Sequence, residues 1–132
     1  MLPLYITSGE PAGIGPDICL SLADRIDERP IVVLADINML RDRAKILDFH
    51  IDIIEYMGQE KSSKQGQLFV EHVPLYEDVV LGELNSNNAA YVLEQLRRSA
   101  FYAMQGQSVG VATAPVQKSV INDAGIHFSG HT

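Results

Sequence analysis

Residues able to do chemistry gather in the last stretch of the chain, between Thr113 and Thr132. The stretch reads TAPVQKSVINDAGIHFSGHT and contains Lys118, Asn122, Asp123, Ser129, His131 and Thr132. Lys118 could pair with a phosphate or a carboxylate, and His131 could serve as a general base, a ligand anchor or a hydrogen-bond donor. A structural role for His131 stays open beside these. Because a globular domain rarely ends on such a cluster, we expect the chain to be a piece of a longer protein.

The histidines of this stretch give a weak metal signal. His127 and His131 are four residues apart, as two ligands on one helix would be, but Gly125 and Gly130 favour a loop. Asn122, Asp123 and Gly125 equally suit the C-terminal turn of a helix. The two remaining histidines, His50 and His72, flank strand-like runs and are expected at the surface or at strand ends.

A second candidate site is the glycine-rich segment TSGEPAGIGP, from Thr7 to Pro16, between a predicted strand and a predicted helix. In doubly wound α/β folds this junction lies at the carboxyl edge of the sheet, where ligands bind. A phosphate-binding Walker loop would need Gly-Lys-Ser/Thr where this chain has Gly15, Pro16 and Asp17, and a dinucleotide fingerprint would need a third glycine where Ile18 stands. Glu10 and Asp17 would also repel a phosphate. A tight turn that packs a helix against a strand is the alternative interpretation.

The elements that must position these segments follow from hydrophobic patterning. Apolar runs predict strands at residues 4–7, 31–35, 51–56, 68–73 and 109–112. The first two are nearly continuous, as in a parallel sheet covered on both faces, and the last is also expected to be buried. Helical spacing predicts helices at residues 16–26, 36–47 and 88–104. Pro74 is expected to end the fourth strand or to place it at a sheet edge. The predicted fold is a three-layer α/β/α arrangement around a mainly parallel sheet.

The longest helix is expected to bury one apolar face. That face consists of Ala89, Val92, Leu93, Leu96, Ala100, Phe101 and Met104. Tyr91 and Tyr102 on the same helix are expected to pack, and the run from Asn85 to Asn88 is expected to form a turn and the helix N-cap. Gly106 is the expected C-terminal stop.

Composition limits the classes of function. The 132 residues suffice for one domain, and 46% hydrophobic with 20% charged residues is typical of a globular protein. A net charge of −7 argues against sequence-independent nucleic-acid binding. Cys19 is the single cysteine and is expected to be buried and inert. No apolar run approaches membrane-spanning length and the N-terminus lacks signal-peptide features, so we expect a cytoplasmic protein.

Two motifs together resemble the 4-hydroxythreonine-4-phosphate dehydrogenase family of vitamin B6 biosynthesis. ITSGEPAGIGPD near the start is similar to the family's Gly-Glu-Pro-x-Gly-Ile-Gly-Pro loop. TAPVQKSVINDAGIHFSGHT is similar to its Pro-Val-x-Lys-x-x-Ile-Asn-x-Ala-Gly…Gly-His-Thr segment. The resemblance spans residues 1–132 but covers only the family's N-terminal part, so the second domain is expected to be absent from this chain.

The resemblance implies an activity and its requirements. Members have two α/β domains related to those of isocitrate and isopropylmalate dehydrogenases, and they work as homodimers. They oxidise 4-phosphooxy-L-threonine with NAD or NADP, and the resulting β-keto acid loses CO₂ to give 3-amino-2-oxopropyl phosphate. A divalent metal (Zn, Mg or Co), held by three histidines across the dimer interface, polarises the reacting oxygen.

Carried onto this sequence, the family's substrate-binding His-Thr pair is His131 and Thr132, with supporting roles for Lys118 and Asn122. The metal ligands are expected beyond residue 132, so no metal ligand is assigned within this chain, and no individual cofactor contact is assigned. Because the family fold is unlike the dinucleotide-binding Rossmann fold, the failed fingerprint is no objection to an NAD enzyme. The glycine-rich segment is then expected to shape the crevice between domains.

Two other functions stay open at this point. A paralogue acting on another hydroxy acid, such as 4-phospho-D-threonate or a diol intermediate of aromatic catabolism, would share the same front motifs. A chain of these 132 residues alone would instead be a non-catalytic, truncated α/β domain.

Overall fold

A five-stranded parallel sheet forms the centre of the molecule. The computed structural model describes residues 1–25, 28–78, 80, 82 and 86–113. The strands are β1 (Leu4–Thr7), β2 (Ile31–Ala35), β3 (Asp52–Glu55), β4 (Gln67–His72) and β5 (Gly110–Thr113). They lie in the order β3-β4-β2-β1-β5, and all neighbours pair in parallel. The predicted parallel sheet is therefore confirmed.

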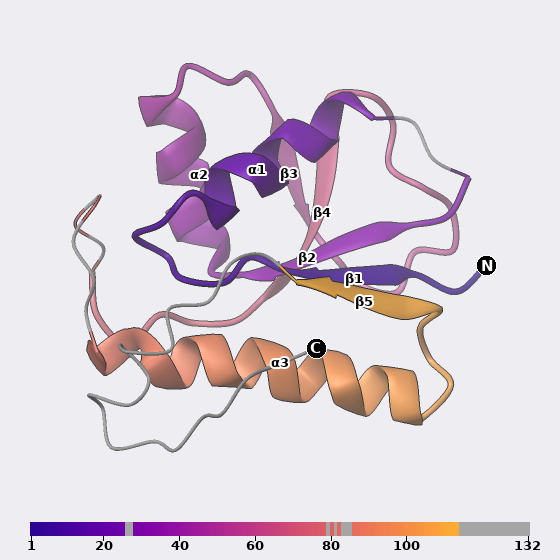
Figure 1. Ribbon diagram of the computed structural model, residues 1–132. Coiled ribbons are helices and arrows are strands. Elements are labelled where there is room, and N and C mark those ends of the chain that lie inside the picture. The colour runs from indigo at the N-terminus through magenta and orange to yellow at the C-terminus, as the bar shows by residue number, and fades with distance from the viewer. Residues whose placement is uncertain (26–27, 79, 81, 83–85, 114–132) are drawn as a thin grey trace.

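Helices cover both faces of this sheet (Figure 1). Helices α1 (Gly15–Ser21) and α2 (Ile37–Ile46) lie on one face, and α3 (Ala89–Met104) lies on the other. The predicted three-layer α/β/α arrangement is confirmed. Helix α1 is shorter than predicted, because the chain tightens after Ser21 into a 3₁₀ helix at Leu22–Asp24. None of the described helices is both long and apolar enough to span a lipid bilayer.

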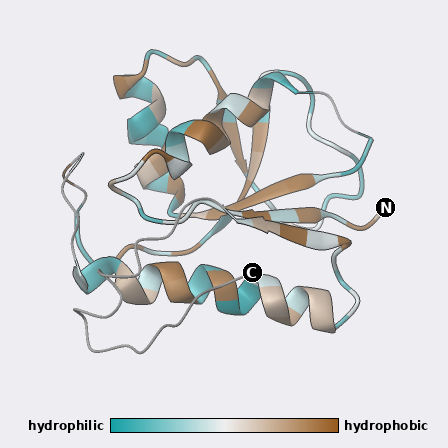
Figure 2. Ribbon diagram, in the orientation of Figure 1, coloured by the Kyte–Doolittle hydropathy of each residue, from teal (hydrophilic) through white to brown (hydrophobic). Residues whose placement is uncertain are grey.

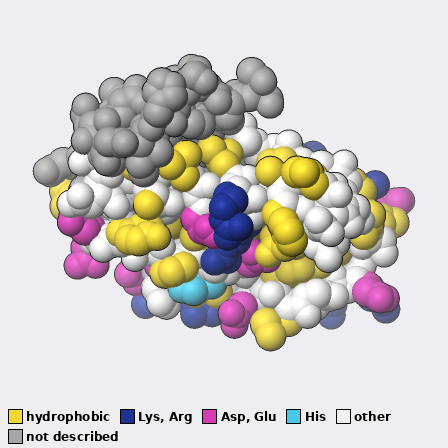
Figure 3. All heavy atoms as spheres, turned by 90° about the horizontal axis from the view of Figure 1, so that it is seen from below, with side chains coloured by type: hydrophobic (Ala, Val, Ile, Leu, Met, Phe, Trp, Pro, Cys, Tyr) yellow, Lys and Arg dark blue, Asp and Glu magenta, His cyan; other side chains and the backbone are white. Residues whose placement is uncertain are grey.

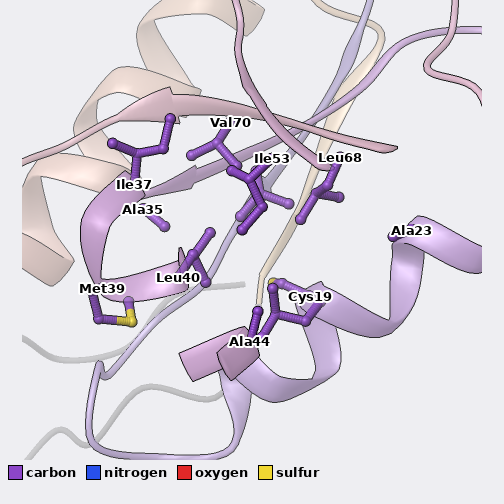
Figure 4. Packing of buried hydrophobic residues seen from close by; sticks show 12 residues of the cluster. Cys19, Ala23, Ala35, Ile37, Met39, Leu40, Ala44, Ile53, Leu68 and Val70 are labelled. Carbon is purple, nitrogen blue, oxygen red and sulfur yellow. The ribbon is translucent and has the colours of Figure 1, made fainter. Parts of the chain in front are cut away.

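Two hydrophobic clusters join the layers, one on each face. Val33 and Ala35 of β2 belong to the cluster beneath α1 and α2, whereas Val32 and Leu34 belong to the cluster beneath α3. This alternation follows from the two-residue period of a strand. Figure 2 shows the hydrophobic strands at the centre of the fold, and Figure 4 shows the first cluster, where Cys19 faces Leu40 and Ala44.

Cys19 is predicted to be unreactive in the folded protein. It is 1% exposed, and burial raises the pKa of its thiol to about 12. Because the thiolate is the reactive form, a maleimide added at neutral pH is expected to label the native protein far more slowly than the urea-unfolded protein. Mass spectrometry of the labelled protein measures this, and equal labelling rates in both states would contradict the burial of Cys19.

The ends of the helices follow local rules. Pro16 lies in the first turn of α1, as predicted, and Asp36 is the N-cap of α2, where its Oδ1 accepts a hydrogen bond from Met39 N at 3.0 Å. Pro74 lies after the end of β4, which is an interior strand between β2 and β3, so the edge alternative for this strand is wrong. Gly106 has a φ of +69° and follows the end of α3, as predicted.

The predicted apolar face of α3 is only partly correct. Ala89 and Val92 of that face are buried, but the helix also buries Tyr91, Gln95 and Ser99, which were not assigned to it. Phe101 and Met104, which were expected inside, are 51% and 85% exposed. The helix is rotated because Tyr91 and Gln95 find hydrogen-bond partners beneath it, which removes the penalty for burying them. The N-cap position of Asn88 is confirmed, but its side chain bonds the backbone of residues 76–77 rather than the helix.

Strand β5 also differs from its prediction as a buried strand. Val111, Ala112 and Thr113 are exposed. The reason is its place at the edge of the described sheet, where it pairs with β1 on one side.

Candidate functional site

The two candidate segments start side by side at one edge of the sheet. β1 and β5 are parallel neighbours, and their last residues, Thr7 and Thr113, are register partners. The glycine-rich loop follows Thr7, and the closing segment follows Thr113. This edge holds the carboxyl ends of the strands, which is where α/β sheets bind ligands. β5 reaches its place through α3, whereas β1 continues through α1 on the opposite face, so the chain changes direction here.

The glycine-rich loop, residues 8–16, has a defined conformation. Gly9 has a φ of +76°, which side-chain-bearing residues rarely adopt, and this explains why a glycine is needed at this position. Gly13 N donates to Glu10 O at 3.1 Å and closes a turn. Ser8 N and Ser8 Oγ both donate to Leu34 O, at 3.3 and 2.9 Å, and join the loop to β2. The loop therefore leaves the sheet in a fixed direction.

Helix α3 holds the start of the loop through Gln95, which is fully buried. Gln95 Oε1 accepts hydrogen bonds from Gly9 N at 3.0 Å and from Ser8 Oγ at 3.2 Å. Its Nε2 donates to Gly9 O at 3.4 Å. One side-chain amide thus satisfies both backbone groups of Gly9, and it fixes the residue whose conformation turns the loop.

Helix α2 holds the far part of the loop through Arg43, which is 3% exposed. Its guanidinium donates to Pro11 O at 2.5 Å and to Gly13 O at 3.3 Å. It also pairs with Asp17 Oδ1 at 2.7 Å. The planar group bonds three acceptors in different directions, which a lysine ammonium on its flexible stem would match poorly. The loop is therefore fastened from both faces of the sheet.

Tyr91 extends the α3 contact to the end of β2. Its hydroxyl accepts a hydrogen bond from Asp36 N at 3.0 Å and lies 3.4 Å from Ser8 Oγ. Burial raises the pKa of Tyr91, so it remains a neutral phenol near pH 7. The carboxyl ends of β1 and β2 are consequently tied to the same helix.

The basic pair Arg97–Arg98 is already committed to carboxylates on α3 and β4. Arg97 pairs with Glu94, and Arg98 Nη1 lies 3.3 Å from Glu71 Oε2. Glu71 also accepts from Tyr102 Oη at 2.7 Å, and burial together with this carboxylate raises the pKa of Tyr102 to about 12. These arginines therefore stabilise the α3–β4 contact, and we do not assign them to a phosphate.

A groove of about 640 Å³ lies between α2 and residues 75–78. Four carboxylates line it: Asp36, Asp42, Glu77 and Asp78. The one basic side chain in its lining, Arg43, donates its hydrogen bonds to the glycine-rich loop. Coulomb repulsion makes this groove unsuitable for a phosphorylated ligand.

The described residues do not form a metal site. No group of three or more His, Cys, Asp or Glu side chains there is placed to hold an ion. His72 Nδ1 accepts a hydrogen bond from Ile37 N at 3.1 Å at the start of α2, and the side chain of His50 is 91% exposed. The expected positions of these two histidines, at a strand end and at the surface, are confirmed.

The residues predicted to bind substrate lie outside the described part of the chain. These are His131 and Thr132, with Lys118 and Asn122 in supporting roles. Sequence reasoning missed Gln95 and Arg43, the two side chains that hold the loop. The available signal for Gln95 was its place on one helix face with Tyr91 and Ser99, at intervals of four residues. The sequence carried no signal for Arg43.

Sequence comparison finds one family over most of the chain. Residues 27–132 match the family model described as "Pyridoxal phosphate biosynthetic protein PdxA". A 4-hydroxythreonine-4-phosphate dehydrogenase from Vibrio parahaemolyticus is 45% identical over 98% of this chain and 40% of its own length. The enzyme of that name from Pseudomonas aeruginosa is 46% identical over 99% of this chain and 41% of its own. The chain thus spans about 40% of the length of these relatives.

Solved structures share the fold. The 4-hydroxythreonine-4-phosphate dehydrogenase of Klebsiella pneumoniae superposes with a TM-score of 0.86 at 26% identity, over 99% of this chain and 42% of that one. A terephthalate 1,2-cis-dihydrodiol dehydrogenase from Burkholderia xenovorans superposes with a TM-score of 0.76 at 22% identity, over 96% of this chain and 38% of its own. The second likeness concerns the fold alone.

Proposed function

Because the chain belongs to the PdxA family of pyridoxal phosphate biosynthetic proteins, we propose that it is the N-terminal portion of a 4-hydroxythreonine-4-phosphate dehydrogenase. The proposal rests on the similarity of nearly the whole chain to these enzymes. The arrangement of the two family motifs supports it, because they start on adjacent strands at the edge of the sheet where ligands bind. The second α/β domain would face this edge and close the crevice.

The proposed reaction has two steps. The carbon that bears the substrate hydroxyl, next to the amino-bearing carbon, transfers its hydrogen as a hydride to the nicotinamide ring of NAD or NADP, and the hydroxyl loses its proton to solvent or a base. The ketone formed lies β to the carboxylate, so the C–C bond to the carboxylate breaks, CO₂ leaves, and the electron pair is delocalised onto the ketone oxygen. Protonation then gives 3-amino-2-oxopropyl phosphate.

This chain is proposed to supply one wall of the crevice and part of the substrate contacts. His131 and Thr132 would hydrogen-bond the substrate, with support from Lys118 and Asn122. The loop held by Gln95 and Arg43 would give that wall a fixed shape, and pre-organisation of this kind lowers the entropic cost of positioning a substrate. The described residues do not fit the divalent metal that the family resemblance implies, so its ligands are proposed beyond residue 132 and no step is assigned to it here.

We propose further that the complete protein is a homodimer in the cytoplasm. Apolar side chains on α3 and around β5 are exposed, including Phe101, Met104 and Val109. Such exposure supports an interface in which another part of the protein, or a second copy of it, covers this surface. Figure 3, which views the molecule from the side of α3, shows hydrophobic side chains on both sides of a group of basic and acidic residues. A single buried cysteine is consistent with a reducing compartment.

A substrate panel tests the proposed function. The full-length protein that carries this chain is assayed for nucleotide reduction with 4-hydroxythreonine 4-phosphate, 4-phospho-D-threonate and an aromatic cis-dihydrodiol. We expect the first to give the highest kcat/KM. Preference for either of the others would replace the proposal with the corresponding paralogue. Residues 1–132 alone are expected to be inactive, because one wall of the crevice cannot assemble the site.

A further inference from the structure

We propose that Asp36 and Asn88 are positioning residues for the dehydrogenase reaction. They hold residues 75–78, the crossing segment, at the edge of the sheet where the candidate site begins. The proposal rests on the proposed function and deepens it, because it assigns part of the crevice wall to the chain that follows β4, in addition to the glycine-rich loop.

Two side chains hold the backbone of the crossing segment. The segment follows β4 on the side of the sheet where the strands have their carboxyl ends (Figure 1). Asp36 Oδ2 accepts a hydrogen bond from Leu75 N at 2.9 Å. Asn88 Oδ1 accepts from Tyr76 N at 3.2 Å and from Glu77 N at 3.0 Å, and its Nδ2 donates to Glu77 O at 3.3 Å. Three consecutive backbone N–H groups are thus satisfied by side chains from β2 and α3.

Apolar packing does little to hold the crossing segment. Tyr76 is 64% exposed, and Glu77 and Asp78 are exposed as well. Leu75 alone of the four packs against the hydrophobic clusters, and it is only partly buried. The groove of about 640 Å³ lies between the segment and α2. The hydrogen bonds to Asp36 and Asn88 therefore fix a segment that burial alone would leave loose.

The crossing segment is joined to the glycine-rich loop. Gly82 N, a few residues further along the chain, donates to Ala12 O at 3.1 Å. Ala12 lies between the two loop residues whose carbonyls accept hydrogen bonds from Arg43. Asp36 is also the N-cap of α2, the helix that carries Arg43. The segment and the loop consequently share their supports and form one wall.

Loss of an anchor is expected to weaken substrate binding more than it slows the reaction of bound substrate. A released segment populates other conformations, and the apparent affinity falls in proportion to the fraction that stays competent to bind. Once substrate is bound, the competent arrangement is restored. The expected signature is therefore a raised KM with a nearly unchanged kcat.

Variants of the full-length enzyme test this signature. If about a tenth of Asn88→Ala molecules keep the held arrangement, the KM for 4-hydroxythreonine 4-phosphate should rise about tenfold. Asp36→Asn should raise KM by a smaller factor at little cost in melting temperature, because asparagine caps a helix as well as aspartate does but offers a single acceptor oxygen. Val92→Ala, in the core beneath α3 and 2% exposed, is the control: it should lower the melting temperature and leave KM unchanged.

Hydrogen exchange followed by mass spectrometry tests the positioning without turnover. Asn88→Ala is expected to speed exchange in peptides that cover residues 75–82 and residues 8–16, since the two segments form one wall. The same peptides of Val92→Ala should exchange as in the wild-type protein. Unchanged exchange at residues 8–16 in Asn88→Ala would overturn the proposal.

The outcomes separate the two claims. A KM that is unchanged in Asn88→Ala, or that rises equally in Asn88→Ala and Val92→Ala, would overturn the positioning role and leave the proposed function standing. A wild-type enzyme that does not turn over 4-hydroxythreonine 4-phosphate would overturn the proposed function. The exchange rates would then still decide whether the two side chains hold the wall.

Discussion

Replacing Arg43 with methionine is expected to lower the free energy of unfolding by about 3 kcal/mol, because the change leaves buried carbonyls of the loop without donors. The guanidinium bonds Pro11 O, Gly13 O and Asp17, and it is 3% exposed. Most of the loss should come from the two carbonyls, since Asp17 is 38% exposed and water screens its charge. Urea unfolding of the full-length protein measures the change.

Arg41→Met is the matched control for this prediction. Arg41 is an exposed residue of the same helix with one hydrogen bond, to Ile53 O at 3.2 Å, and its loss should cost less than about 1 kcal/mol. Arg43→Lys should recover part of the stability but not the shape of the loop, so the KM for substrate should stay raised. Equal effects of Arg41→Met and Arg43→Met would show that Arg43 does not hold the loop.

Replacing Gln95 with leucine is expected to lower the free energy of unfolding by about 2 kcal/mol and to raise the KM of the full-length enzyme. Leucine fills similar space, but Gly9 N and Gly9 O lose their partner inside the α3–sheet interface. Gly9 is then free to leave the conformation with a φ of +76° that directs the loop. Denaturant unfolding and steady-state kinetics on the same preparations measure both effects.

Ser99→Ala is the control for Gln95, because Ser99 lies one turn further along the same face and is 2% exposed. Its Oγ bonds Leu96 O within its own helix, at 2.9 Å, so its removal should leave KM unchanged. If the two variants changed KM equally, the contact between Gln95 and the loop would have no functional consequence.

The strands and their layer arrangement could be predicted because each follows from local sequence. Ile31–Ala35 is an uninterrupted apolar run, and such a run is expected where helices cover both faces of a parallel sheet. The glycine-rich segment was placed correctly at a strand end because glycine and proline interrupt both neighbouring patterns. Because β1 and β5 are parallel neighbours, the start of the glycine-rich segment lies beside the start of the closing segment.

The orientation of α3 could be predicted only in part, because part of its buried face is decided by partners far away in sequence. Hydrophobicity alone favours Phe101 and Met104 as core residues, and both are exposed. Gln95 is buried because Ser8 and Gly9 offer it hydrogen bonds, across 87 and 86 positions of sequence, respectively. A polar side chain that is buried against a loop distant in sequence produces no hydrophobic periodicity from which its burial could be predicted.

Arg43 illustrates the same limit. On an amphipathic helix an arginine next to Asp42 is expected to face water, and the sequence gives no reason to bury it. Its burial depends on carbonyl groups that only the folded loop presents. The apolar pattern of the helices and strands was thus predictable. The buried polar side chains that position the candidate site were not.

The most direct measurement is the stoichiometry of the reaction catalysed by the full-length protein with 4-hydroxythreonine 4-phosphate. Nucleotide reduction is followed by absorbance, and the CO₂ released is quantified in the same reaction. We predict that NADH or NADPH and CO₂ form in equal amounts and that neither forms without the substrate. A folded, full-length protein that reduces no nucleotide with this substrate would contradict the assignment of this chain to a 4-hydroxythreonine-4-phosphate dehydrogenase.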